Sequence, residues 1–253
     1  MTRGLRGALA FLTRIPADRG HGAPEVARSL PWFPVVGALV GAAVAGVYAA
    51  GGLVWGSLPA AVVAVAAGTL LTGALHEDGL ADVADGLGGR NPDEARRIMK
   101  DPAHGTYGVA AMALGLLARV GAIASLGPWA ALAWIPAAHA ASRGAAVGLL
   151  AGARDPDREG LGAETAAHVA PGAAWLALIV GLALAAAGVG LWLPAVAALV
   201  VGASFGVGRL AARRLPGVSG DVLGAAQQVG EVLVLLLAAA VVGQGWPGAV
   251  WWR

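Results

Sequence analysis

The 253-residue chain is 58% hydrophobic and only 13% charged, about half the charged fraction of a typical soluble domain. This composition argues against a soluble protein and for one embedded in a membrane. The sequence contains no cysteine, which excludes disulfides, iron–sulfur clusters and thiolate zinc sites. The net charge of +2 is too small to indicate nucleic acid as a partner.

The first 32 residues form an N-terminal arm ahead of the first long apolar run. Residues 5–15 combine arginines with large apolar side chains, a pattern typical of a short helix on the membrane surface, although a solvated arm would also carry it. The arm has no apolar core followed by a small-residue cleavage site, so we expect no removable signal peptide.

Seven apolar runs follow, and as helices they would cross a bilayer core of about 30 Å. The predicted spans cover residues 33–55, 58–76, 107–126, 129–150, 172–191, 193–208 and 222–243. The 40 glycines of the chain would let such helices approach closely. The predicted fold class is all-α: a polytopic membrane helical bundle of about seven transmembrane helices, formed as one domain by residues 1–253.

Charged residues are distributed unevenly over the connections between these spans. The turns near Gly56, Gly127 and Leu191 hold no Lys, Arg, Asp or Glu, whereas basic residues gather in the N-terminal arm, in segment 77–106 and in the later connections. Basic connections mark the cytoplasmic side of a membrane. We therefore expect a multi-pass protein of the cell inner membrane whose N-terminus and active site are cytoplasmic.

The segment 76–86, HEDGLADVADG, is the strongest local signal for chemistry. Asp78, Asp82 and Asp85 stand at i, i+4 and i+7, so a helix would hold their carboxylates within about 60° of one another. Three like charges on one stripe repel, and Mg²⁺ would remove the repulsion because it binds carboxylate oxygens and keeps positions for phosphate. We predict that these aspartates are catalytic and bind Mg²⁺. A solvated acidic loop is the alternative, but the apolar residues between the aspartates argue against it.

His76 and Glu77 lie off this stripe on a helical wheel. His76 is nevertheless a catalytic candidate, as a base or as a partner for phosphate charge. A capping or interfacial histidine is the alternative. A change at Glu77 is expected to affect turnover much less than a change at any of the three aspartates.

A cluster of basic residues lies in the segment 90–100, a short loop beyond the acidic helix. Arg and Lys neutralise phosphate oxygens, and glycines let backbone amides approach them, so this segment suits a pyrophosphate. The predicted substrate-binding residues here are Arg90, Arg97, Lys100 and Asp101. Basic residues in a cytoplasmic loop also serve as topology signals alone.

Further candidates lie later in the chain. Residues 154–162, RDPDREGLG, are a loop by composition and would be a solvated turn or part of the site. Asp221 enters the last span and would cap that helix or bind a ligand. Arg119, Arg143 and Glu231 fall within spans, where unpaired charges cost several kcal/mol. Arg119 and Glu231 would either pair or help to bind an anion, and Arg143 and Asp221 complete the predicted substrate-binding set.

Short sequence blocks along the chain occur in the order in which a known family carries them. Over nearly its whole length, the chain resembles the cobalamin synthase family of adenosylcobinamide-GDP ribazoletransferases. The matching blocks are FLTRIP at 11–16, WFPVVG at 32–37, HEDGLAD and DG within 76–86, IMKD at 98–101, GTYG at 105–108, SRG at 142–144, EGLG at 159–162, GDVLGA at 220–225 and GE at 230–231. Their shared order and spacing are specific, although each block alone is weak. Glu77 stands where many members carry an apolar residue, so the resemblance assigns it no role.

The resemblance implies a membrane-bound, Mg²⁺-dependent phosphotransferase of cobalamin biosynthesis. A ribose hydroxyl of α-ribazole, or of its 5′-phosphate, would attack the cobinamide-linked phosphorus of adenosylcobinamide-GDP. GMP would leave, and adenosylcobalamin or its 5′-phosphate would form. The expected partners are these two substrates and the lipid bilayer, with a homo-oligomer as an alternative to a monomer.

Two other functions are considered. DVADGLGGR at 82–90 matches the first half of the metal motif of CDP-alcohol phosphotransferases, which make phospholipids, but Ala103 and Tyr107 replace the aspartates of the second half. A transporter would place polar residues and broken helices near the bilayer midplane, often within internal repeats. The sequence shows no convincing repeat, and most acidic residues fall on one face.

Overall fold

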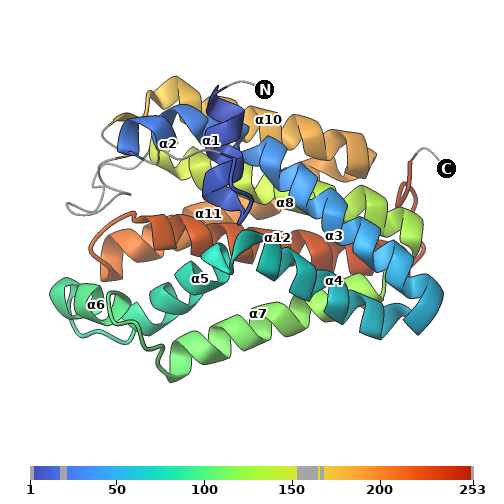
Figure 1. Cartoon of the computed structure of the whole chain (residues 1–253), viewed down its shortest axis with the longest axis horizontal. Coiled ribbons are helices and arrows are strands. Elements are labelled where there is room, and N and C mark those ends of the chain that lie inside the picture. The colour runs from blue at the N-terminus through green and yellow to red at the C-terminus, as the bar shows by residue number, and fades with distance from the viewer. Residues whose placement is uncertain (1–2, 18–21, 153–164, 166–167, 252–253) are drawn as a thin grey trace.

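The computed structural model describes residues 3–17, 22–152, 165 and 168–251, and all regular secondary structure in these ranges is helical. Long helices run roughly side by side along the long axis of the molecule (Figure 1). The helices are α1 Arg3–Leu12, α2 Ala23–Ser29, α3 Phe33–Trp55, α4 Ser57–Thr72, α5 Leu75–Gly86, α6 Pro92–Met99, α7 Thr106–Ala124, α8 Pro128–Gly148, α10 Pro171–Val189, α11 Leu193–Arg214 and α12 Gly220–Gly243. The short 3-10 turns are η1 Leu30–Trp32, η2 Leu149–Ala151 and η3 Gly190–Trp192. The predicted all-α membrane bundle is confirmed.

Each predicted span coincides with a helix. α3 has the predicted bounds, and α7, α8, α10 and α12 begin and end within about two residues of theirs. α11 continues past the predicted end to Arg214, and α4 stops at Thr72 instead of residue 76. Apolar run length is therefore a good guide to where these helices lie.

Length and apolar composition nevertheless mark fewer spans than the seven predicted. In the described part of the chain, four helical stretches qualify, or five if the bent pair α4–α5 is one span. One stretch, Gly172–Arg214, contains both α10 and α11, which η3 separates at Gly190, where φ is +53°. α8 is not among the four because its buried stretch 137–147 carries His139, Ser142 and Arg143. A helix surrounded by protein can hold such polar residues, whereas one facing lipid cannot.

The chain bends by 88° between α4 and α5. Gly73 and Ala74 have φ values of +66° and +58°, so α4 ends in a left-handed cap and α5 starts in a new direction. A side chain at position 73 would collide with the Arg14 guanidinium, and the Arg14 backbone N–H donates to the Leu71 carbonyl oxygen at 2.8 Å. The N-terminal arm thus fills the bend. α4 has 16 residues, so it meets the length and composition of a span only together with α5.

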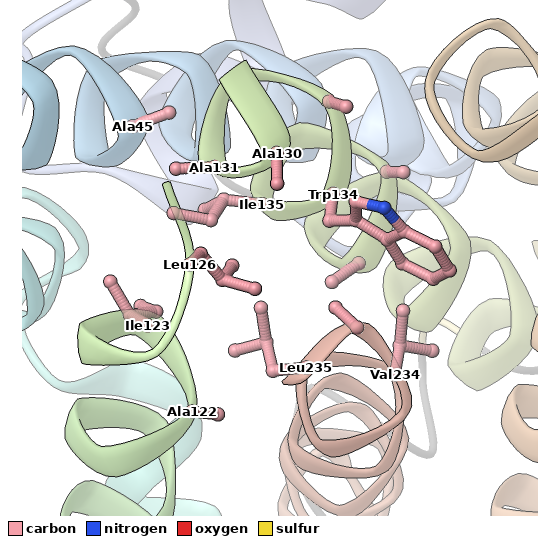
Figure 2. Packing of buried hydrophobic residues seen from close by; sticks show 14 of the residues in the cluster. Ala45, Ala122, Ile123, Leu126, Ala130, Ala131, Trp134, Ile135, Val234 and Leu235 are labelled. Carbon is pink, nitrogen blue, oxygen red and sulfur yellow. The ribbon is translucent and has the colours of Figure 1, made fainter. Parts of the chain in front are cut away.

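The apolar core lies where α3, α7, α8 and α12 meet (Figure 2). Trp134 of α8 is fully buried there, and its indole N–H donates to the Ala249 carbonyl oxygen at 2.8 Å. α3 approaches α8 closely at Gly41, where a Cβ would stand only 2.9 Å from the Ile135 carbonyl oxygen. Small residues at helix contacts are the usual means of packing in membranes. This packing fixes α8 and α12, which carry most of the buried polar groups described below.

The N-terminal arm packs on the bundle through α1 and α2. α1 buries Ala8 and Leu12, and the Phe11 ring stacks on Phe33 with centroids 5.5 Å apart. The predicted helix of residues 5–15 is therefore present as far as Leu12, and its apolar face is turned toward α2 and α3. Its contact with a membrane surface stays a prediction.

The two ends of the bundle differ. Figure 1 shows α2 and α6 toward one end, at the left, and the α3–α4 turn and the C-terminus at the other. The charge-bearing α6 and the uncharged turn at Gly56 therefore lie at opposite ends, as the uneven distribution of charge in the sequence predicts.

Candidate active site

α5 carries the three aspartates predicted as metal ligands, and they differ in exposure. The side chain of Asp78 is 62% exposed and that of Asp82 is 15% exposed, while Asp85 is buried. The His104 ring lies between the first two, with Nε2 at 3.4 Å from Asp78 Oδ1 and Nδ1 at 3.5 Å from Asp82 Oδ1. The loop before α7 therefore returns to the aspartate stripe.

Asp85 holds the start of α7. Its Oδ2 accepts the Gly105 N–H at 2.7 Å, and its Oδ1 accepts the Gly108 N–H at 2.8 Å. Amides at a helix start have no partner within the helix, and the helix dipole favours a carboxylate there. A Cβ at either glycine would meet the Asp85 carboxylate. Asp85 is thus the least available of the three aspartates to a cation.

A fourth carboxylate, Asp221, approaches from α12. α5 and α12 touch at Gly79, where a Cβ would stand 2.9 Å from the Asp221 carbonyl oxygen. Burial and the neighbouring carboxylates of Asp221 and Asp78 raise the pKa of Asp82 to about 6. Because these surroundings disfavour a further negative charge, they favour a cation.

The donor set suits Mg²⁺, which is often bound by one or two carboxylates together with substrate phosphates. Among the described residues, no three His, Cys, Asp or Glu side chains converge closely enough to hold a metal ion. Asp85 is engaged with the two amides, so the arrangement favours Asp78 and Asp82. The predicted set of three aspartate ligands stays a prediction.

Behind α5, buried charges connect three helices. The Arg119 guanidinium donates from Nη2 to Glu77 Oε1 at 2.6 Å and from Nη1 to Glu231 Oε1 at 3.3 Å. All three side chains are buried. The pairing of Arg119 with Glu231 is therefore present, and Glu77 extends it. Because an unpaired charge at this depth is costly, we expect the bundle to depend on this network.

Arg143 lies on the other side of Glu231. Its Nη1 donates to Glu231 Oε2 at 3.3 Å and to the His139 carbonyl oxygen at 3.1 Å. The Gln227 amide donates from Nε2 to the same Glu231 oxygen at 2.6 Å and to Ser142 Oγ at 3.1 Å. Glu231 therefore fixes Arg143 and Gln227 together.

A cavity of about 480 Å³ lies between this network and the N-terminal arm. We call it the substrate cavity because three of the residues predicted to bind substrate line it. Its polar lining includes His76, Lys100, Arg143, Asp221 and Gln227. Its apolar lining includes Phe11, Leu12, Val26, Leu30, Phe33, Met99, Ala146 and Val147. A mostly apolar chamber with a few convergent polar groups is typical of a small-molecule site.

Other cavities border the same helices. One of about 20 Å³ lies among His76, Glu77, Arg119 and Glu231 and has room for a single water. Another, of about 990 Å³, is lined by residues of α8, α10 and α11 and shares Arg96 with the substrate cavity. Arg143 and Gln227 therefore connect the network to the substrate cavity, whereas Glu77, Arg119 and Glu231 border only the small one.

The predicted substrate-binding residues fall into two groups. The group that lines the substrate cavity comprises Lys100, Arg143 and Asp221. The group that is exposed and lines none of these cavities comprises Arg90, Arg97 and Asp101. Arg90 lies 3.8 Å from Glu94 within an ion pair, and Asp101 accepts the Ala103 N–H at 2.9 Å. Contact of these three with substrate stays a prediction.

Arg96, and not Arg97, is the α6 arginine in the cavity wall. Arg96, Met99 and Lys100 all line the cavity, because positions i, i+3 and i+4 share one face of a helix. Met99 also packs close to Gly86 of α5. The sequence did hold a signal for this choice: Arg96, and not Arg97, stands three positions before the apolar Met99 and so shares its helix face.

His104 and Gln227 were also missed. Gln227 is a polar residue in an apolar span, one turn before Glu231, and polar residues in spans are functional candidates. His104 stands in a loop, and no spacing rule connects it with the aspartates. The predicted loop 154–162 lies outside the described residues.

The family model described as Cobalamin-5-phosphate synthase matches residues 4–239. The chain belongs to this family. An adenosylcobinamide-GDP ribazoletransferase of Ralstonia nicotianae is 44% identical over 94% of this chain and 95% of its own length. Proteins of the same name from Bradyrhizobium diazoefficiens and Chlorobaculum tepidum are 39% and 40% identical, over 93% and 94% of this chain and 93% and 96% of their own lengths. No solved structure matches the chain.

Membership of the cobalamin-5-phosphate synthase family confirms the resemblance drawn from the ordered sequence blocks. The chain is a membrane-embedded transferase of cobalamin biosynthesis. The alternatives of a phospholipid-forming enzyme and of a transporter are set aside on this finding.

Proposed function

We propose that this protein joins adenosylcobinamide-GDP to α-ribazole, or to α-ribazole 5′-phosphate. A ribose hydroxyl oxygen bonds to the cobinamide-linked phosphorus, and the bond from that phosphorus to the bridging oxygen breaks. GMP leaves with the electron pair, and the hydroxyl proton passes to a base. The observation that carries the proposal is the 480 Å³ cavity. Asp221 lies in its wall, and the charge of the same carboxylate helps to raise the pKa of Asp82, so the cavity adjoins the aspartates of α5.

Phosphoryl transfer depends mainly on positioning and on neutralisation of charge. Lys100 and Arg96 line the cavity and are the cations proposed to stabilise charge that develops on the leaving GMP. His76 lines the same wall, and its backbone packs 3.4 Å from the Cβ position of Gly224. We assign His76 the role of proton acceptor for the attacking hydroxyl.

Mg²⁺ is the proposed cofactor, held by Asp78 and Asp82 with Asp221 beside them. When bound, it would neutralise pyrophosphate oxygens and stabilise the leaving phosphate. Asp85 has a supporting role, since it holds the start of α7 and so the adjoining His104.

The proposal includes a location. The charged α6 end of the bundle would face the cytoplasm and the α3–α4 turn would face outward, across the cell inner membrane, by the positive-inside rule. Both substrates would then reach the site from the cytoplasm. Nothing in this scheme requires more than one copy of the chain, although a homo-oligomer is compatible with it.

The test uses the full chain in lipid nanodiscs with adenosylcobinamide-GDP and α-ribazole. GMP and adenosylcobalamin should form in equal amounts with Mg²⁺ and should not form with EDTA. No GMP release under either condition would overturn the function, and equal release under both would overturn the Mg²⁺ assignment.

A further inference from the structure

The wall of the substrate cavity holds two buried polar atoms without partners. Nε of Arg143 and Oε1 of Gln227 make no hydrogen bond, although these residues are only 3% and 1% exposed. A buried polar atom left unpaired costs about 1–3 kcal/mol. Because both residues line the cavity, a bound molecule is the natural partner for both atoms.

Contacts with Glu231 determine which hydrogen-bonding atoms of Arg143 and Gln227 are left for a ligand. Its Oε2 accepts from Arg143 Nη1 and from Gln227 Nε2, and the same Gln227 nitrogen also donates to Ser142 Oγ. With its two amide hydrogens engaged, Gln227 can meet a ligand only as an acceptor, through Oε1. Arg143 offers a donor at Nε. Arg143 Nε and Gln227 Oε1 are therefore the donor and the acceptor that these two wall residues keep unpaired, beside His76, Lys100 and Asp221 in the same lining.

We propose that this cavity binds the ribazole nucleoside, with its dimethylated benzimidazole ring among the apolar side chains, and that Arg143 and Gln227 determine its specificity. The ring has one free acceptor nitrogen for Arg143 Nε. A ribose hydroxyl other than the attacking one is the donor for Gln227 Oε1. The inference rests on the proposed function, which supplies this ligand.

Size and polarity favour the nucleoside over the other substrate. The volume falls in the range of about 300–1,000 Å³ that holds small ligands, whereas a corrin ring with its side chains is far larger than one nucleoside. The walls formed by Phe11, Leu30 and Met99 are apolar. The polar edge groups of guanine would find partners only beside Lys100, Asp221 and the other polar lining residues. A ring with two methyl groups loses nothing in such surroundings.

The first test changes the size of the chamber. Ala146 of α8 and Val26 of α2 line it, so Ala146→Leu and Val26→Phe should each reduce the space for the ring. We expect KM for α-ribazole to rise at least tenfold, about the discrimination that a hydrophobic pocket achieves per methylene. KM for the riboside without the two ring methyls should change less than threefold. Equilibrium binding should be measured for each nucleoside without Mg²⁺ or the second substrate. The variants should weaken the binding of α-ribazole more than the binding of the riboside without the ring methyls.

The matched control is Ala113→Leu, because Ala113 is exposed on α7 away from the cavity. It should leave both KM values unchanged. If neither cavity variant alters the preference between the two nucleosides while the wild type still releases GMP, the cavity assignment is overturned and the proposed function stands. If the wild type releases no GMP, the function itself fails.

The second test concerns Gln227. Gln227→Met keeps the length of the side chain but removes its acceptor, so KM for α-ribazole should rise at least tenfold with little change in KM for adenosylcobinamide-GDP. Gln228→Met is the control, because Gln228 is also buried on α12 but lines the small cavity instead. A rise in KM for adenosylcobinamide-GDP alone would show that the cavity binds the nucleotide end of that substrate, and would overturn the proposal.

Discussion

Asp82 and Asp85 lie less than one turn apart on α5 but have different surroundings. Asp85 accepts the Gly105 and Gly108 amides, so the protein already compensates its charge. Asp82 shares its surroundings with Asp78 and Asp221, which raise its pKa together with burial. We infer that Asp85 serves the fold and that Asp82 serves the reaction.

Changing each aspartate to asparagine separates these roles. Asp82→Asn should lower GMP release about a hundredfold or more, as loss of a charge-stabilising group does, and should leave the folded protein at least as stable. Asp85→Asn should cost about 1–3 kcal/mol of stability, because its NH₂ group would face a backbone donor. Turnover and thermal unfolding of both variants measure this. An inactive Asp85→Asn protein with unchanged unfolding would make Asp85 a ligand.

The interior charges make a second prediction at this scale. Arg119→Met would leave Glu77 and Glu231 without their shared partner, and should destabilise by about 3–5 kcal/mol. The double variant Glu77→Gln, Arg119→Met should recover part of that loss, since fewer unpaired charges remain. Thermal unfolding in detergent, with the exposed Arg97→Met as control for loss of an arginine, measures the effect. Equal stability of Arg119→Met and Arg97→Met would contradict the network.

This network also revises the expectation for Glu77. The residue does lie off the aspartate stripe, as the helical wheel predicted, but it is buried and bonded to Arg119. Its replacement should therefore act on stability, and any loss of turnover should follow the loss of folded protein.

At the scale of elements, the position of α5 depends on three contacts from distant segments. The bend at Gly73 and Ala74 sets its direction, Asp85 ties its end to α7, and Gly79 lies against α12. The last contact brings the α12 residue Asp221 toward the aspartates. The acidic site is therefore assembled by packing between helices and not by α5 alone.

Gly79→Ala tests this assembly. The new methyl group would stand 2.9 Å from the Asp221 carbonyl oxygen and 3.0 Å from its Cα, so α12 must shift at a cost of about 1–3 kcal/mol. GMP release should fall at least tenfold. Gly115→Ala is the control, because its methyl group would lie at 3.5 Å from a flexible Leu80 side chain. Equal turnover of the two variants would show that the α5–α12 contact does not position the site.

At the scale of the whole molecule, the charge-bearing helix α6 and the uncharged α3–α4 turn lie at opposite ends of the bundle (Figure 1). A bilayer tolerates this arrangement only if the two ends reach water on opposite sides, since the helices between them are apolar. The topology can therefore be tested with one position at each end.

Single cysteines are suitable probes because the chain contains none. Arg97 and Ser57 are exposed near opposite ends, so Ser57→Cys should react with a membrane-impermeant maleimide on intact spheroplasts. Arg97→Cys should react only after permeabilisation. The reverse pattern would invert the orientation, and labelling of both on intact spheroplasts would contradict the opposite placement of the ends.

The sequence by itself determined the class of the fold, the place of most helices and the family. Apolar runs such as 33–55 report helix bounds directly, because the thickness of a bilayer sets the length of a span. The spacing of Asp78, Asp82 and Asp85 likewise placed them on one helix, because a helical period depends only on neighbouring positions.

Only the tertiary structure decided which of these groups meet. Arg119 and Glu231 are 112 positions apart, and no periodicity shows that Glu77 shares the same arginine or that Gln227 faces the substrate cavity. The bend after Thr72 was missed because Arg14, from another part of the chain, occupies it. Side-chain pairing and cavities arise from contacts between helices, so they follow from packing and not from the order of residues along any single helix.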